Sequence, residues 1–382
     1  MGTPYRMVAT VEEALSLFDK RKPLFTDTET VGFYGRVSLL QLFQEGHDEV
    51  IMVRWPDPFM TAVNLSSYHS VWHNAHYDVT TIQAQTSTRW CPDRLDCTFY
   101  LARLALPQLM THSLDVVMAF CVGLDPYIAQ GLNKKVLQKT DWGKEELTDE
   151  QLQYAATDVY HMPAVWNRVS VEIESNSYKL DMHALRKALD FQNNGVPVCQ
   201  DAVNERLREN NAKIAEYNMP ININSWQQVR PYIGEERSDD LALAEFSAEG
   251  NERAKAVRAV RKLTKQNSFL IKKFNTPRIY GKFAPSAKSG RFTCKDQNLQ
   301  QLPRALKGVF RAPKGRVFVH ADYAQLELRT ICAITRCKLM EKLFREGKDL
   351  HGYTAEMLFG ADYTPEHRQL SKNYNFGYLL AA

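Results

Sequence analysis

Acidic side chains in three short blocks of the first 160 residues are suited to binding metal ions. Asp27 and Glu29 form the first block, Asp78 lies in the second, and Asp158 closes the third, four residues after Tyr154. Carboxylate oxygens are preferred ligands of hard divalent cations, and two such cations side by side can hydrolyse a phosphodiester. One ion would lower the pKa of an attacking water and the other would stabilise the leaving 3′ oxygen, while Tyr154 would orient the water.

The spacing within each block predicts a shared direction for its side chains. Asp27 and Glu29 follow an apolar strand at residues 23–26, and strand side chains two apart point to the same face. Asn74 and Asp78 are four apart, as are Tyr154 and Asp158, so each pair would share a helix face if its segment is helical.

Strand and helix signals in this region supply the elements that would hold these groups. Apolar runs predict strands at 23–26, 37–43 and 49–53, and a helical section follows. Thr148 and Gln151 form a capping box that opens the helix carrying Tyr154. Strands followed by helices indicate an α/β or α+β domain that ends near residue 175.

Composition limits the possible classes of protein. The chain has 382 residues, 44% of them hydrophobic and 24% charged, with a net charge of +4, as in ordinary globular proteins of two or three domains. Its seven cysteines include no CxxC pair, which indicates reduced thiols. Because the sequence shows neither a signal region nor an 18-residue apolar run, we expect an intracellular, cytoplasmic location (the host cytoplasm for a viral protein) and no membrane partner.

A basic region begins after the acidic segment 235–240. Between Arg253 and Lys295 there are thirteen Lys or Arg and no Asp or Glu. Residues 253–274 are predicted to form a helix, and its expected apolar stripe consists of Val257, Val260, Leu263 and Ile271. The absence of carboxylates favours a surface that follows phosphates over an ordinary solvated helix. Its candidate DNA-binding residues include Arg258, Arg261, Lys262 and Lys265.

The three acidic blocks, with the residues around them, resemble the exonuclease motifs of the DEDD superfamily in its tyrosine-containing branch. The matching segments are 25–30, 72–78 and 154–158, and the resemblance covers residues 7–170. It implies a ribonuclease H-like fold. His73 and His76 could be metal ligands beside Asp78, but packing or substrate contacts are the preferred interpretation. Asp96 stands where the family often has a further Asp, and a structural role is favoured for it.

A second set of motifs resembles the palm and early fingers of family A DNA polymerases, related to bacterial DNA polymerase I and its phage counterparts. These motifs lie at 289–293, 296–303, 322–329 and 368–372, and Phe376-Gly377 follows them. The resemblance implies that Asp322 binds a catalytic metal together with the Tyr323 carbonyl, and that Glu327 excludes a 2′-hydroxyl. The further residues implied are Arg368 and Lys372 for the triphosphate, Phe376 for nucleotide stacking, and Arg291 for the primer–template minor groove.

The expected architecture is α/β, with a ribonuclease H-like exonuclease domain followed by a helical thumb and an incomplete palm and fingers. The expected boundaries are 1–175 for the exonuclease, 176–285 for the helical thumb and linker, and 286–382 for palm and fingers. The family's second polymerase carboxylate, in a His-Asp-Glu turn, has no counterpart here, and Leu380 and Ala381 depart from the fingers pattern. A split polymerase, an interrupted gene and a truncation remain open, and in each the palm sheet would keep an unpaired apolar edge.

The sequence thus predicts the N-terminal part of a phage-like replicative DNA polymerase with a complete 3′–5′ proofreading exonuclease. Two Mg²⁺ or Mn²⁺ ions are the expected cofactors. The expected partners are single-stranded 3′ ends, primer–template DNA, dNTP if the polymerase site is completed, and a possible second polypeptide. The alternatives are a stand-alone exonuclease of repair or RNA type and a non-catalytic DNA-binding or assembly subunit.

Overall fold

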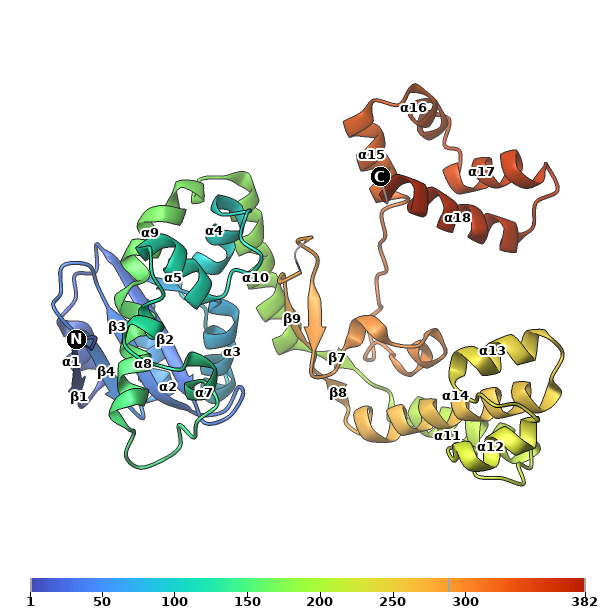
Figure 1. The fold of residues 1–382 in the computed structure, drawn as a ribbon, viewed down its shortest axis with the longest axis horizontal. Helices are drawn as coiled ribbons and strands as arrows, with labels where there is room; N and C mark the ends of the chain where they lie inside the picture. Colours follow the sequence, from blue (N-terminus) through green and yellow to red (C-terminus); the bar gives the residue numbers. More distant parts are fainter. Residues whose placement is uncertain (1, 288, 381–382) are drawn as a thin grey trace. The chain divides into compact units, whose positions relative to one another are not determined.

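The computed structural model describes residues 2–287 and 289–380, which divide into two compact units. The first unit extends to Pro313 and the second begins at Lys314. Figure 1 labels most of their helices and strands. No described helix has the length and apolar character needed to cross a membrane.

A mixed sheet forms the centre of the N-terminal region in the part of the chain that the structure describes. Its strand order is β1-β4-β3-β2-β5-β6, with β2 antiparallel to β3 and parallel to β5. The strands are β1 (Tyr5–Val8), β2 (Pro23–Thr30), β3 (Val37–Phe43), β4 (Val50–Arg54), β5 (His69–Trp72) and β6 (Leu95–Cys97). The strand predictions for 23–26, 37–43 and 49–53 are therefore confirmed, and β2 continues through Asp27 and Glu29.

Helices cover this sheet and hold the acidic side chains against it. Every residue of β3 is buried, as its apolar run requires, and α8 packs across β2, β3 and β4. The helices are α1 (Val11–Ser16), α2 (Pro58–Leu65), α3 (Ala75–Thr86), α4 (Thr98–Ala105), α5 (Leu114–Val122), α6 (Pro126–Ala129), α7 (Lys134–Leu137), α8 (Asp149–Tyr160), α9 (Met162–Val169) and η1 (Ser170–Glu172). The predicted capping box at the start of α8 is confirmed, since Thr148 and Gln151 bond each other's backbone.

A mostly helical region with two small two-stranded sheets, β7–β8 and the β9–β10 hairpin, completes the first unit. Its elements are α10 (Asn176–Asn194), β7 (Val196–Pro197), α11 (Gln200–Glu216), α12 (Trp226–Ile233), α13 (Asp240–Ala248), α14 (Glu252–Lys273), β8 (Arg278–Ile279), β9 (Lys282–Ala284), β10 (Thr293–Lys295), η2 (Leu299–Gln301) and η3 (Arg304–Val309). The helix predicted from Arg253 is α14. It buries Val257 and Val260, but Ile271 is 59% exposed and Leu270 is buried instead, so the predicted stripe is wrong at Ile271.

The second unit contains four short helices and an extended segment among its described residues. The helices are α15 (Leu326–Thr335), α16 (Lys338–Arg345), α17 (Leu350–Phe359) and α18 (Pro365–Leu380). From the sequence we expect a strand at 316–322 followed by a helix from Gln325, and that helix is α15. The strand predicted at 316–322 is not formed: Val317 and Val319 are 81% and 86% exposed. A strand needs a neighbour for its backbone hydrogen bonds, and no described segment pairs with this one.

The capping box gives a direct test of how α8 is held. Thr148→Ala removes the hydroxyl that accepts the Gln151 N–H, so the amides of α8 should open more easily by about 1 kcal/mol. Hydrogen exchange read along α8 measures this locally. Ser225→Ala is the matched control, because the Ser225 side chain makes no capping bond to α12. If Thr148→Ala destabilised α8 no more than Ser225→Ala destabilises α12, the capping role of Thr148 would be contradicted.

Candidate metal centre

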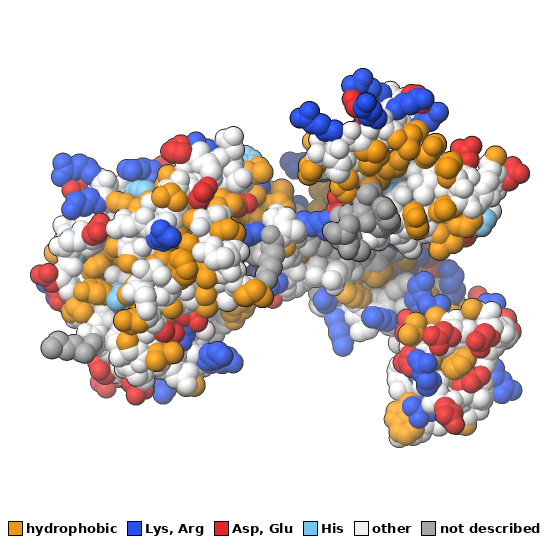
Figure 2. Space-filling view, turned by 45° about the horizontal axis from the view of Figure 1, so that its top comes forward, with side chains coloured by type: hydrophobic (Ala, Val, Ile, Leu, Met, Phe, Trp, Pro, Cys, Tyr) orange, Lys and Arg blue, Asp and Glu red, His pale blue; other side chains and the backbone are white. Residues whose placement is uncertain are grey.

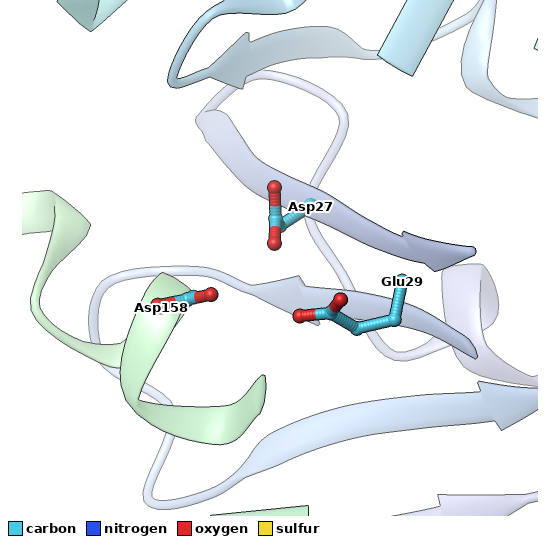
Figure 3. A group of neighbouring side chains, drawn as sticks. All are labelled: Asp27, Glu29 and Asp158. Carbon is cyan, nitrogen blue, oxygen red and sulfur yellow. The ribbon is translucent and has the colours of Figure 1, made fainter. Parts of the chain in front are cut away.

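Three of the predicted carboxylates meet at the centre of the sheet. Asp27 and Glu29 project from the same face of β2, and Asp158 approaches from α8 (Figure 3). A carboxylate oxygen from each of the three lies within 4.8 Å of the others. Such spacing allows one cation to be bound by more than one of these groups.

Asp78 is connected to this group by a hydrogen bond from Thr28, the residue between Asp27 and Glu29 on β2. It is buried on α3, and the Thr28 hydroxyl donates a 2.7 Å hydrogen bond to Asp78 Oδ1. The expectation that Asn74 and Asp78 share a helix face is wrong, because Asn74 precedes α3 in a left-handed conformation with φ 66°. An asparagine side chain tolerates this conformation better than most residues.

Two tyrosines surround Asp158. Tyr154 lies one turn earlier on α8, as predicted, and hydrogen-bonds the Asp158 carboxylate. The Tyr127 hydroxyl also donates to Asp158 Oδ1. Tyr127 was missed in the sequence because it comes from α6, a helix of four residues, and no spacing links it to Asp158.

The four carboxyl groups share an unfavourable electrostatic environment. Burial, followed by the charges of neighbouring carboxylates, raises the pKa of Asp27 and of Glu29 well above their ordinary values. Burial likewise raises the pKa of Asp158, and it raises the pKa of Asp78 to about 7 although the Thr28 hydrogen bond opposes this shift. Lys134 acts in the opposite direction on Glu29 and Asp158. A bound cation would relieve this repulsion, so the donor set fits a metal.

The neighbouring histidines do not complete a metal site. Both His73 ring nitrogens are within hydrogen-bond distance of protein atoms, Thr98 Oγ1 at 2.9 Å and the His112 carbonyl at 3.0 Å. Burial lowers the pKa of His73 to about 3 and that of His76 to about 4, which keeps both neutral. The His73 contacts agree with the preferred interpretation of packing or substrate contacts, and both histidines line the acidic cleft.

Asp96 has the structural role that the sequence favoured. Its carboxylate lies 2.6 Å from His69 Nε2 and accepts a 2.6 Å hydrogen bond from the Tyr178 hydroxyl. This network joins β5 and β6 to α10, and Asp96 is not among the residues that line the acidic cleft.

The carboxylates open into a cleft of about 660 Å³ within the first unit. Its walls come from the sheet, from α7 and from the β9–β10 hairpin. Basic residues line it on two sides: Lys134, Lys135, Lys282 and Lys295. The hairpin is attached to the N-terminal region by Arg103, whose guanidinium donates to the carbonyls of Pro285 and Ala287 at 3.0 and 2.7 Å.

The candidate polymerase residues lie mainly on the surface of the second unit. Asp322 is exposed, and Tyr323 is 78% exposed on the extended segment ahead of α15. Glu327 is half-buried in the first turn of that helix, and Lys372 is exposed on α18. Among the described residues, Asp322 belongs to no group of three or more His, Cys, Asp or Glu side chains that could hold a metal ion.

The remaining nucleotide-binding candidates have protein partners. Arg368 Nε lies 2.6 Å from Asp349 Oδ2, and Asp349 also caps α17. The ring of Phe376 lies 5.5 Å from that of His351.

The predicted basic surface is only partly free for DNA. Arg261 donates to the carbonyls of Ile223 and Ser238, so it supports the fold of the α12–α14 region. Arg258 lies 3.6 Å from Asp240, whereas Lys262 and Lys265 line an open groove along α14. Arg291 is exposed in the β9–β10 loop. In Figure 2 the visible face of the α12–α14 helices mixes Lys and Arg with Asp and Glu.

Sequence comparisons match both parts of the chain. Residues 5–174 match the 3′–5′ exonuclease family, and residues 196–381 match DNA polymerase family A. DNA polymerase I from Aquifex aeolicus is 26% identical over 97% of this chain and 70% of its own length. The thermostable DNA polymerase I from Thermus aquaticus is 28% identical over 62% of this chain, which covers 30% of that relative.

A solved structure shows the same fold. It is the POL domain of Pol1 from M. smegmatis in complex with a DNA primer-template and dNTP, with a TM-score of 0.68 and 18% identity. The match covers 98% of this chain and 71% of that one. The exonuclease match also implies use of divalent metal ions. Because an exonuclease segment and a polymerase segment occur together in the order found in DNA polymerase I, the chain belongs to DNA polymerase family A.

Proposed function

We propose that residues 1–175 form a 3′–5′ exodeoxyribonuclease that removes nucleotides from single-stranded or frayed DNA ends. The observation that carries the proposal is the convergence of Asp27, Glu29 and Asp158 within 4.8 Å, with Asp78 hydrogen-bonded to the intervening Thr28. Two Mg²⁺ or Mn²⁺ ions suit this set of carboxylate oxygens, and when bound they would supply an activated water and charge stabilisation.

The protein side chains have separate tasks in this proposal. Asp27, Glu29, Asp78 and Asp158 hold the ions. Tyr154 orients the attacking water through its hydroxyl, and the Tyr127 hydroxyl, donated from α6, keeps the Asp158 carboxylate in position. Burial of these groups fixes their geometry before substrate enters, which lowers the reorganisation needed for reaction.

We propose that the second set of motifs belongs to a nucleotidyl-transfer site. Asp322 and the Tyr323 carbonyl would bind metal, and Glu327 would exclude a 2′-hydroxyl. Arg368 and Lys372 are four residues apart on α18, so they can face one triphosphate. Phe376 would stack on the nucleotide, Arg291 would contact the primer–template, and α14 would belong to the thumb. The division at 175 and 285 follows these proposed tasks.

The family match favours this function over the alternatives. A stand-alone exonuclease does not account for residues 196–381, which match the polymerase family. A non-catalytic DNA-binding subunit does not account for four carboxylates around one cleft, of which Asp78 and Asp158 are buried. Primer–template DNA and dNTP are the proposed partners, supported by the DNA and dNTP in the M. smegmatis complex.

Removing one metal-binding carboxylate tests the nuclease. Asp27→Ala and Asp158→Ala should each reduce Mn²⁺-dependent release of 3′ nucleotides by at least about 1,000-fold, because the ions lose a ligand. The measurement uses 5′-labelled single-stranded DNA, with an RNA strand in parallel to test the RNA-type alternative. Asp48→Ala is the control, since Asp48 is exposed and does not line the cleft. Near wild-type rates in either cleft variant would refute the site.

The raised pKa values predict that the metal-free protein loses stability as pH rises. Between pH 4 and 7 the folded state keeps a proton on Asp78 that the unfolded chain has released, so the free energy of unfolding falls with increasing pH. Asp78→Asn should therefore stabilise the protein in EDTA at pH 8 by about 1–3 kcal/mol, since one pKa unit corresponds to about 1.4 kcal/mol.

Hydrogen exchange of the sheet amides at pH 4.5 and pH 8 would measure this difference. The gain from Asp78→Asn should shrink at the lower pH, and Mn²⁺ should stabilise the wild type more than the variant. A variant that is less stable than the wild type at pH 8 in EDTA would contradict the proposed repulsion.

Polymerase activity should require more than these 382 residues provide. Because the printed sequence contains no His-Asp-Glu turn to pair with Asp322, we expect this polypeptide alone to extend no primer. Addition of a polypeptide that carries the remaining palm and fingers of a relative should restore synthesis, measured as extension of a labelled primer. Extension by the isolated chain would show that another group replaces that carboxylate.

A further inference from the structure

Lys134 is a basic residue whose position in the acidic cleft the proposed metal chemistry does not explain. It opens α7 and lines the cleft together with Asp27, Glu29 and Asp158. Its side chain is only 14% exposed, so its ammonium group is largely removed from water. Placing a lysine there costs desolvation, which a purely solvated surface lysine would avoid.

The present partner of Lys134 leaves its charge available. Lys134 Nζ lies 3.2 Å from Asp115 Oδ1 and 5.0 Å from the centroid of the Tyr127 ring. Asp115 also lines the cleft, and its side chain is 33% exposed. Because Asp115 is the more exposed of the two and lines the cleft, an anion that enters the cleft can replace it beside Lys134.

The other lysines of the cleft are less suited to this exchange. Lys282 lies 2.7 Å from Asp296 and is stacked 3.6 Å above the Tyr34 ring, which fixes it on the hairpin. Lys135 on α7 and Lys295 on β10 are both exposed to solvent. Lys134 thus combines a long flexible side chain, low exposure and a replaceable partner.

A nucleic-acid strand entering this cleft faces a strong electrostatic barrier. Its phosphates approach four carboxylates, and bound divalent ions offset that repulsion only at the reacting linkage. A cation beside the acidic cluster would bind the next phosphate and hold the strand in register, and charge-assisted bonds to phosphate are among the stronger polar contacts.

We propose that Lys134 is a substrate-positioning residue that releases Asp115 and binds a backbone phosphate next to the scissile linkage of the 3′ end. This inference rests on the proposed exonuclease function. It adds a specific contact between the protein and its substrate, and it assigns Asp115 the task of holding Lys134 when no strand is bound.

The first test compares binding of single-stranded DNA in Ca²⁺, which occupies carboxylate sites while allowing affinity to be measured without relying on turnover. Lys134→Gln should weaken binding about 10-fold to 100-fold, the range for loss of one charge-assisted contact. Lys134→Arg should retain most of the affinity. Lys139→Gln is the control, because Lys139 is exposed and does not line the cleft.

The decisive test neutralises the phosphate as well as the lysine. Oligonucleotides carrying one methylphosphonate at each of the linkages near the 3′ end are bound to wild type and to Lys134→Gln. When the methylphosphonate replaces the phosphate that Lys134 contacts, the wild type should bind the strand no more tightly than Lys134→Gln does. The effects of the methylphosphonate and of Lys134→Gln on affinity are then non-additive. Full additivity at every linkage would overturn the proposal, as would unchanged binding by Lys134→Gln.

Asp115→Asn separates substrate contact from a structural role. It breaks the ion pair but leaves Lys134 free, so affinity should match or exceed that of the wild type. A loss equal to that of Lys134→Gln would show that the ion pair itself is needed, and would refute the proposal. Failure of the exonuclease proposal is distinct, because the wild type would then show no metal-dependent cleavage at all.

Discussion

Mutual repulsion among buried carboxylates is the constraint on which the N-terminal region depends. β2 holds Asp27 and Glu29 at the centre of a sheet whose neighbouring strand is fully buried, and α8 holds Asp158 against them. Burial and neighbouring charge raise the pKa values of these groups, so the fold stores an unfavourable arrangement that a cation can relieve. The Thr28 and Tyr127 hydroxyls fix the carboxylates individually without neutralising the cluster.

The same chain supports its two sets of acidic residues very differently. The exonuclease candidates project from a paired strand and from packed helices, so their positions are determined by the core. Asp322 and Tyr323 lie on an extended segment with exposed Val317 and Val319, and no described strand gives that segment hydrogen-bonded neighbours. Its backbone groups face solvent, so burial does not fix the Asp322 side chain.

Sequence patterns predicted those structural features that depend on residues close together in the chain. The strands around Asp27, the capping box at Thr148 and the start of α15 follow from alternation, helix periodicity and end signals. Contacts between distant segments could not be predicted in this way: Tyr127 reaches Asp158 from a separate short helix, and Arg261 is bound by carbonyls from two loops. The strand predicted at 316–322 is not formed, because its apolar residues express only a preference for strand structure and a strand also needs a hydrogen-bonded neighbour.

The attachment of the β9–β10 hairpin has a consequence for how this nuclease can be exchanged between relatives. The hairpin lies within the polymerase-family segment, yet Lys282 and Lys295 form part of the acidic cleft and Arg103 binds the hairpin's carbonyls. Recombination that exchanges residues 1–175 alone would separate the acidic side chains of the cleft from the hairpin lysines that line it. Functional chimaeras should therefore inherit the hairpin together with the nuclease, despite the 106 residues between 175 and 282.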